Sequence, residues 1–121
     1  MKKPRISRAK LSRRRFRAAR GRGASVATAV GTKVSFTLSQ LATMQFHVER
    51  CAKLRHHKCR RYKVMKGSFS RGGGQGRNVV RFTGRLRKRP LKPGLYRLDL
   101  RASTRGAKSA TKRLAFQIVK R

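Results

Sequence analysis

Apolar and polar residues alternate along most of this chain in short runs. A period of two is typical of strands that bury one face and expose the other. The sequence therefore predicts strands whose apolar positions lie within residues 34–38, 44–48, 62–69, 80–86, 96–100 and 114–119. The first two runs are close enough to pair as a hairpin or to cross between two sheets. No segment shows the pattern of a convincing helix.

Turn signals separate the runs. Residues 71–76 are rich in glycine and predict a flexible turn. Pro90 and Pro93-Gly94 break the chain again, and residues 103–110 are expected to form a loop. Together these features predict an all-β chain that forms one antiparallel β-sandwich of six to seven strands.

The first 24 residues are rich in arginine, and Ile6, Leu11 and Phe16 are their sizeable apolar residues. Two interpretations stay open: a solvated basic arm, or an arm containing a first strand over about residues 6–18. We accordingly divide the chain into a basic arm, 1–24, and a sandwich, 25–121.

Charge dominates the composition. The chain has 36 Lys and Arg and only 2 Asp and Glu, Glu49 and Asp99, which gives a formal net charge of +34. The Debye length at physiological salt is about 8 Å, so the cations of a domain this small repel one another. Because two carboxylates cannot neutralise this charge, we expect a polyanion as partner and a monomer in solution.

Several classes of function are disfavoured. The sequence has no recognisable catalytic triad, carboxylate pair, P-loop or dinucleotide fingerprint, so we expect no enzymatic activity and no cofactor. Two acids are also too few for a calcium site. No apolar stretch reaches the length of a membrane span. Arg, Lys and Ser stand where the apolar part of a signal peptide would lie, so we expect no secretory signal in this chain.

The candidate polyanion-binding residues are the densest groups of cations. They are Arg13, Arg14, Arg15, Arg17, Arg20 and Arg22 on the arm, with Arg60, Arg61, Arg85, Arg87, Lys88 and Arg89 at the sandwich ends. Phosphate contacts by such residues release counterions and supply most of the affinity of non-specific binding. DNA or RNA is the expected partner, bound without sequence readout, because no recognition helix is visible and exposed aromatics are few. Heparin-like or anionic envelope polymers are the other polyanions considered.

The cysteines leave three alternatives. Cys51 and Cys59 can form a disulfide, which would stabilise the fold by about 2–3 kcal/mol and imply an oxidising compartment. They can instead bind zinc with His56 or His57, although the spacing is not that of a known finger. As free thiols among so many cations they would be reactive.

Segments in order along nearly the whole chain resemble the Arg-rich immunoglobulin-like modules of secreted or surface proteins from high-GC bacteria. They comprise residues 6–8, 11–12, 14–19, 31–39, 46–50, 67–69, 81–86, 91–98 and 116–119. The resemblance implies an immunoglobulin-like sandwich, and a structural or adhesive module that docks on anionic envelope polymers or lipid as the alternative function. A cytoplasmic protein, including one of ribosomal type, is the other alternative.

The same resemblance concerns the motif Pro93-Gly94-x-Tyr96-x-Leu98. It places Tyr96 where a tyrosine at the start of a strand can hydrogen-bond back to nearby backbone. An ordinary half-buried aromatic residue is the other interpretation of Tyr96.

Overall fold

The structure, a computed structural model, describes residues 3–18, 31–86 and 89–120, and every regular element in these ranges is a strand. The strands are β1 (Ile6–Leu11), β2 (Arg15–Phe16), β3 (Thr32–Leu38), β4 (Ala42–Arg55), β5 (Lys58–Gly73), β6 (Gly76–Phe82), β7 (Arg85–Leu86), β8 (Arg89–Pro90), β9 (Gly94–Thr104), β10 (Ala107–Lys108) and β11 (Lys112–Ile118). In these ranges, no helix is long and apolar enough to cross a membrane.

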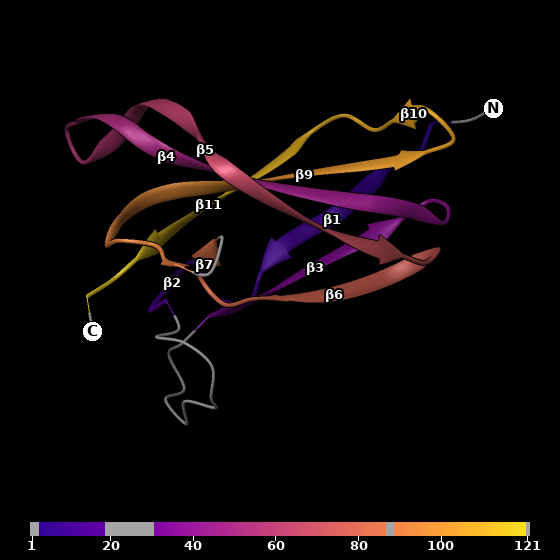
Figure 1. The fold of residues 1–121 in the computed structure, drawn as a ribbon, viewed down its shortest axis with the longest axis horizontal. Helices are drawn as coiled ribbons and strands as arrows, with labels where there is room; N and C mark the ends of the chain where they lie inside the picture. Colours follow the sequence, from indigo (N-terminus) through magenta and orange to yellow (C-terminus); the bar gives the residue numbers. More distant parts are fainter. Residues whose placement is uncertain (1–2, 19–30, 87–88, 121) are drawn as a thin grey trace.

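Two main sheets face each other, and β7 and β8 form a separate two-stranded sheet. The smaller has the order β1-β3-β6, and the larger has the order β2-β11-β9-β4-β5, with β10 paired to β9. Figure 1 shows β4 and β9 in the upper part of the view and β3 and β6 in the lower part. Neighbouring strands are antiparallel except β2 and β11, which are parallel. The predicted all-β sandwich is confirmed.

Aromatic residues fill the space between the sheets. All 6 phenylalanines of the chain belong to the core or pack against it. Phe82 of the smaller sheet stacks on Phe69 at 5.8 Å and meets Phe116 edge-on at 5.6 Å between ring centroids. Phe46 stacks on Phe69 at 4.7 Å. Large rings thus provide a continuous core in a chain whose apolar fraction is only 37%.

The described part of the arginine-rich N-terminal segment lies in the sandwich. β1 pairs with β3, and β2 pairs with β11. Phe16 is fully buried and stacks on Phe116 at 5.4 Å. Where one strand over about residues 6–18 was the second interpretation, the structure has two, β1 and β2, which belong to different sheets. Both form because the apolar anchors of this segment reach the core. Residues 19–24 lie outside the described residues.

The expected boundaries were wrong in the middle of the chain. β4 and β5 form one long hairpin of 14 and 16 residues, which turns at His56 and His57. β5 runs into the predicted glycine turn as far as Gly73, and the turn itself is confined to Gly74 and Gln75 before β6 begins at Gly76. A Cβ on Gly73 would lie 2.6 Å from Leu38 Cδ1, so a larger residue would clash there. Likewise, β9 extends to Thr104 and β10 follows, in place of part of the predicted loop at 103–110.

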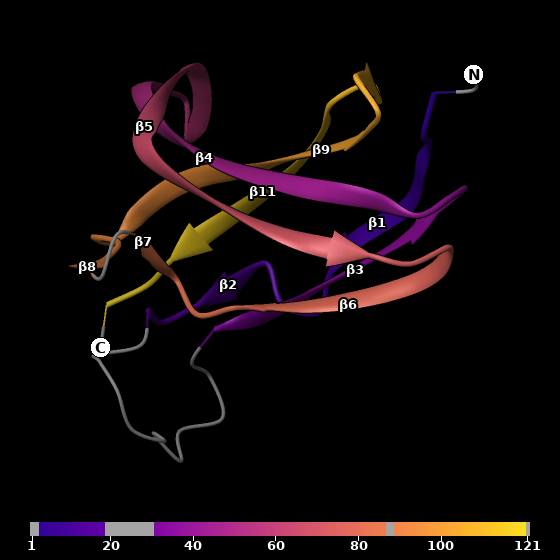
Figure 2. The same ribbon diagram turned by 45° about the vertical axis from the view of Figure 1, so that its right-hand side comes forward.

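The runs at 34–38 and 44–48 do not pair with each other. β3 belongs to the smaller sheet and β4 to the larger, so the chain crosses between sheets after Leu38. Figure 2 shows the far end of the β4–β5 hairpin rising beyond the sandwich and coiling.

Candidate polyanion interface

The described N-terminal candidates lie along one edge of the sandwich. Arg13, Arg14 and Arg15 are exposed, and Arg17 is half-buried. Their backbone is fixed: Arg13 N–H donates to Thr32 Oγ1 at 2.9 Å, and the Arg14 carbonyl accepts from the amide of Gln117 at 2.7 Å. These guanidinium groups therefore project from a fixed edge. Arg20 and Arg22 lie outside the described residues.

The remaining candidates lie at two other places. Arg60 and Arg61 are exposed on β5 near the end of the long hairpin. Arg85 is half-buried on β7, and Arg89 is exposed on β8, where the two strands pair. Arg87 and Lys88 are outside the described residues. The predicted cations thus form separate groups rather than one site.

The structure assembles a further group that the sequence analysis missed. We call it the basic sheet face, and it consists of the exposed cations on the outer side of the smaller sheet: Arg8, Lys10, Lys33, Arg77 and Arg81. They come from β1, β3 and β6, so sequence density does not reveal them. The outward-facing polar positions of each predicted strand, compared between neighbouring strands, could have identified them.

Strand register sets this face. In β3, Val34, Phe36 and Leu38 point into the core, so Lys33 points outward. Lys33 lies directly opposite Arg81 in the ladder between β3 and β6. Side chains directly opposite each other on antiparallel strands share a face, with Cβ atoms about 5 Å apart. No carboxylate of the described residues separates these two cations, because both acids lie on the other sheet.

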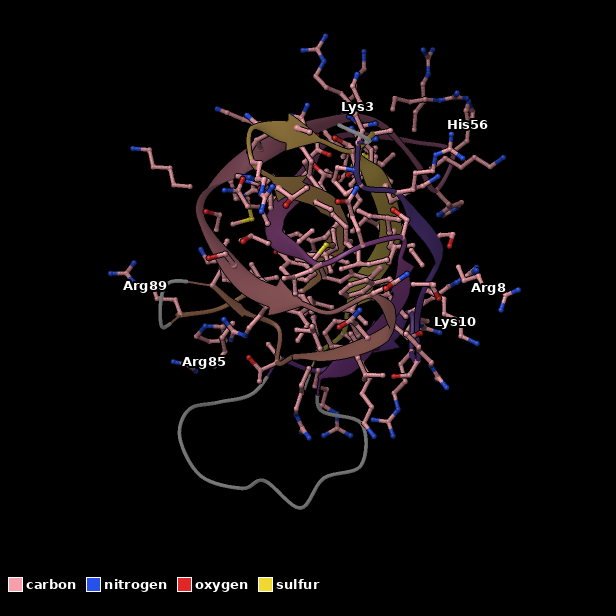
Figure 3. The ribbon with its side chains drawn as sticks, turned by 90° about the vertical axis from the view of Figure 1, so that its right-hand side faces the viewer. Lys3, Arg8, Lys10, His56, Arg85 and Arg89 are labelled. Atoms are coloured by element: carbon pink, nitrogen blue, oxygen red, sulfur yellow. A yellow bond between two sulfur atoms is a disulfide. The ribbon has the colours of Figure 1, made fainter. Side chains whose placement is uncertain are left out.

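A bulge in β1 adds two more cations. Ser7 lies opposite Thr37 and Lys10 opposite Ser35, so β1 carries one extra residue between these pairs. Arg8 takes a φ of 51° there. The extra residue reverses the alternation and brings Lys10 to the outer face beside Ser35. Figure 3 shows Arg8 and Lys10 projecting from the same side of the molecule.

The outer face of the larger sheet is different, because both acids of the chain lie there. Glu49 is 6% exposed and Asp99 is 8% exposed. Arg97 donates from Nη2 to Glu49 Oε1 at 3.0 Å, and from Nε to Oε2. Arg113 Nε lies 3.7 Å from Glu49 Oε2 and 3.7 Å from Asp99 Oδ1. The acids therefore neutralise cations of this sheet and leave the basic sheet face uncompensated.

The environment separates the pKa values of these two carboxyls. The hydrogen bond from Arg97 lowers the pKa of Glu49 to about 2, against the opposing effect of burial. Burial, aided by the adjacent Glu49 carboxylate, raises the pKa of Asp99 to about 7. Arg97 also lies over the Tyr62 ring, with Cζ 4.2 Å from the centroid, so it packs as well as pairs.

The end of the long hairpin carries the disulfide. Cys51 and Cys59 are joined, with a Cα–Cα distance of 5.7 Å, which confirms the first of the three alternatives and leaves neither thiol for zinc. In the ladder Cys51 lies opposite Tyr62, and Cys59 lies opposite Leu54. The disulfide therefore joins two residues that are not opposite each other, across a bulged segment of the hairpin. A hollow of about 400 Å³ next to it is lined by Lys53, Arg55, His56 and Arg60.

Tyr96 closes the turn at the start of β9. Its hydroxyl donates to the Lys92 carbonyl at 2.6 Å, and its ring stacks on Phe116 at 5.4 Å. The predicted hydrogen bond back to nearby backbone is confirmed. Burial raises the pKa of this phenol, although the charge of Arg50 opposes the shift.

In the part of the chain that the structure describes, no three His, Cys, Asp or Glu side chains gather as a metal site. No known protein family matches the sequence, and no curated protein matches it. One solved structure that is similar is Pseudomonas fluorescens alkylpurine DNA glycosylase AlkC bound to DNA containing an abasic site analog, with a TM-score of 0.48 and 16% identity. The match covers 98% of this chain and 31% of that chain, and this likeness is too distant to carry a functional assignment.

Proposed function

We propose that this chain is a non-catalytic module that binds polyanions, above all DNA or RNA, through sequence-independent phosphate contacts. One observation carries the proposal. The basic sheet face gathers five cations, Arg8, Lys10, Lys33, Arg77 and Arg81, while both carboxylates pair with arginines of the other sheet. A chain that only needed a charged surface for solubility could distribute its acids over both faces.

The arrangement suits phosphate better than bases. Strands lie about 4.8 Å apart in a sheet, so flexible Lys and Arg side chains on neighbouring strands can reach successive phosphates of one backbone. Ser7 and Thr37, which lie opposite each other on β1 and β3 and are not buried, add small hydroxyl donors between the cations. Such contacts position a nucleic acid without reading its sequence.

The strand order supports an immunoglobulin-like assignment. An immunoglobulin sandwich places strands A, B and E on one sheet and C, F and G on the other. In that scheme β1, β3 and β6 would be A, B and E, and β4, β9 and β11 would be C, F and G. The hydrogen bond of Tyr96 accords with the tyrosine corner of such domains.

The disulfide favours a second candidate function. Disulfides persist in oxidising compartments, so Cys51–Cys59 suits a secreted or surface location. There the same cations would dock the module on anionic envelope polymers or lipid.

A competition titration separates the two candidates. Labelled duplex DNA bound at physiological salt would be displaced by RNA, single-stranded DNA, heparin, teichoic acid or anionic vesicles, matched by charge. We expect a nucleic acid to compete about tenfold better than the other polymers, which corresponds to about 1.4 kcal/mol. Equal displacement by all of them would favour the surface module.

A further inference from the structure

A groove of about 600 Å³ opens at the end of the sandwich, at the base of the long hairpin. One wall is formed by β4 and β5, and the other by the β7–β8 pair and the segment that leads into β9. Arg50 marks the opening: it follows Val48 on the inner side of β4 and lies opposite Tyr96. The groove therefore lies between the inner faces of the strands, just beyond the packed core.

The floor of the groove is apolar and fixed. Leu86, Leu91 and Tyr96 are 7%, 6% and 3% exposed, and half-buried Met65 lies beside them. The Leu91 amide donates to the Gly84 carbonyl at 2.8 Å, and the Tyr96 hydroxyl donates to the Lys92 carbonyl at 2.6 Å. These bonds hold the second wall in place, so the groove exists before any ligand enters.

The rim is cationic. Its charged members are Arg50, Lys66, Arg89 and Lys92, all exposed, and no carboxylate of the described residues lines the groove. A ligand that matches both parts must combine a compact apolar surface with a group of high negative charge. Inorganic phosphate would leave the apolar floor unmatched, and a lipid would need room for acyl chains beyond a floor this short.

We propose that this groove binds a nucleoside monophosphate unit, with the base on the floor of Leu86, Leu91 and Met65 and the phosphate among the rim cations. The proposal rests on the proposed nucleic-acid function and deepens it. The unit can be a free nucleotide or an unpaired residue of a strand. Volumes of 300–1,000 Å³, with mostly apolar walls and a few polar groups, are usual for small-molecule sites.

The groove is distinct from the basic sheet face. Figure 3 shows Arg89, at the β7–β8 pair, on the opposite side of the molecule from Arg8 and Lys10. Substitutions can therefore remove the rim cations without touching that face.

The test is a calorimetric titration of the full chain with adenosine 5′-monophosphate, ribose 5-phosphate and inorganic phosphate at physiological salt. We expect saturable binding of the nucleotide, about tenfold tighter than that of ribose 5-phosphate. The double variant Arg89→Gln/Lys92→Gln should lose about tenfold in nucleotide affinity. The variant Arg105→Gln/Lys108→Gln removes the same number of charges from the β9–β10 hairpin and should bind like the original chain.

Equal affinity for all three anions, or equal losses in the two variants, would overturn the proposal. Tighter binding of lysophosphatidic acid than of the nucleotide would overturn it in favour of a lipid. Competition by single-stranded DNA but not by a blunt hairpin duplex would identify the unpaired strand as the source of the unit, and no competition would identify the free nucleotide. Duplex affinity, measured separately, tests the proposed function, so the two can fail independently.

Discussion

Lys33 and Arg81 lie directly opposite each other on β3 and β6, and both side chains project outward from the smaller sheet. Like charges in this position destabilise a sheet. In a chain of formal net charge +34, this pair concentrates repulsion where a bound anion would relieve it. On the proposed function, the basic sheet face would lower the stability of the free protein, and a bound polyanion would restore it.

The variant Arg81→Glu should stabilise the free protein and weaken polyanion binding. An opposite-charge pair with Lys33 would replace repulsion by attraction, which is worth roughly 0.2–1 kcal/mol. Urea unfolding and duplex titration measure the two effects. Arg105→Glu, an equal charge change in the β9–β10 turn, is the control. A loss of both stability and binding in Arg81→Glu would contradict this account.

Glu49→Gln should destabilise the fold. The change removes the carboxylate that accepts from two nitrogens of Arg97, and it leaves Arg97 beside Arg113 with less compensating charge. Hydrogen bonds to charged groups contribute about 1.5–3 kcal/mol, so we expect a loss of about 2 kcal/mol. The control is Gln45→Glu, which changes the charge at another position on the same face of β4. It should not reproduce the loss of stability expected for a change at Glu49. Unchanged urea unfolding of Glu49→Gln would show that the buried pair contributes no net stability.

Asp99 should make stability depend on pH. Because its folded pKa is raised to about 7, its contribution is complete below the unfolded pKa of about 4 and is lost as the pH rises through 7. Glu49 stays ionised across this window, since its folded pKa is about 2. Thermal unfolding at pH 5 and pH 8 should show a decrease that Asp99→Asn removes. An identical decrease in that variant would assign the effect to another group.

Reducing the disulfide should loosen the end of the hairpin and spare the sandwich. Residues 50–58, from the end of β4 through the turn to the first residue of β5, include no buried side chain, whereas Val48 still belongs to the buried core. Hydrogen exchange should therefore accelerate at residues 52–60 after reduction, and the amides of β9 should stay protected. The chain-entropy estimate for a loop of this size, about 2–3 kcal/mol, is an upper bound on the global loss. Exchange that accelerates throughout β9 would show that the disulfide supports the whole fold.

The alternation of apolar and polar residues predicted which positions are buried better than it predicted which exposed side chains share a face. Alternation at Val34, Phe36 and Leu38 identified the core positions of β3 without ambiguity. It could not predict that a bulge at Arg8 would bring Lys10 to the same face as Lys33, because one extra residue reverses the alternation.

Which cations lie side by side could not be predicted from the sequence, for a related reason. Sequence density pointed to consecutive cations such as Arg13 to Arg15, yet strand pairing, which brings distant residues together, decides which charges become neighbours. Lys33 and Arg81 are far apart in sequence and adjacent in the sheet. Glu49 and Asp99 meet for the same reason, through the pairing of β4 with β9.

The salt dependence of duplex binding tests the central claim most directly. Each phosphate contact contributes about 0.9 to the slope of log K against log salt. If the basic sheet face carries the binding, Lys33→Gln/Arg81→Gln should reduce the slope by about 2, and Arg105→Gln/Lys108→Gln should leave it nearly unchanged. Equal slopes in the two double variants would contradict the account, because the affinity would then follow net charge and not this face.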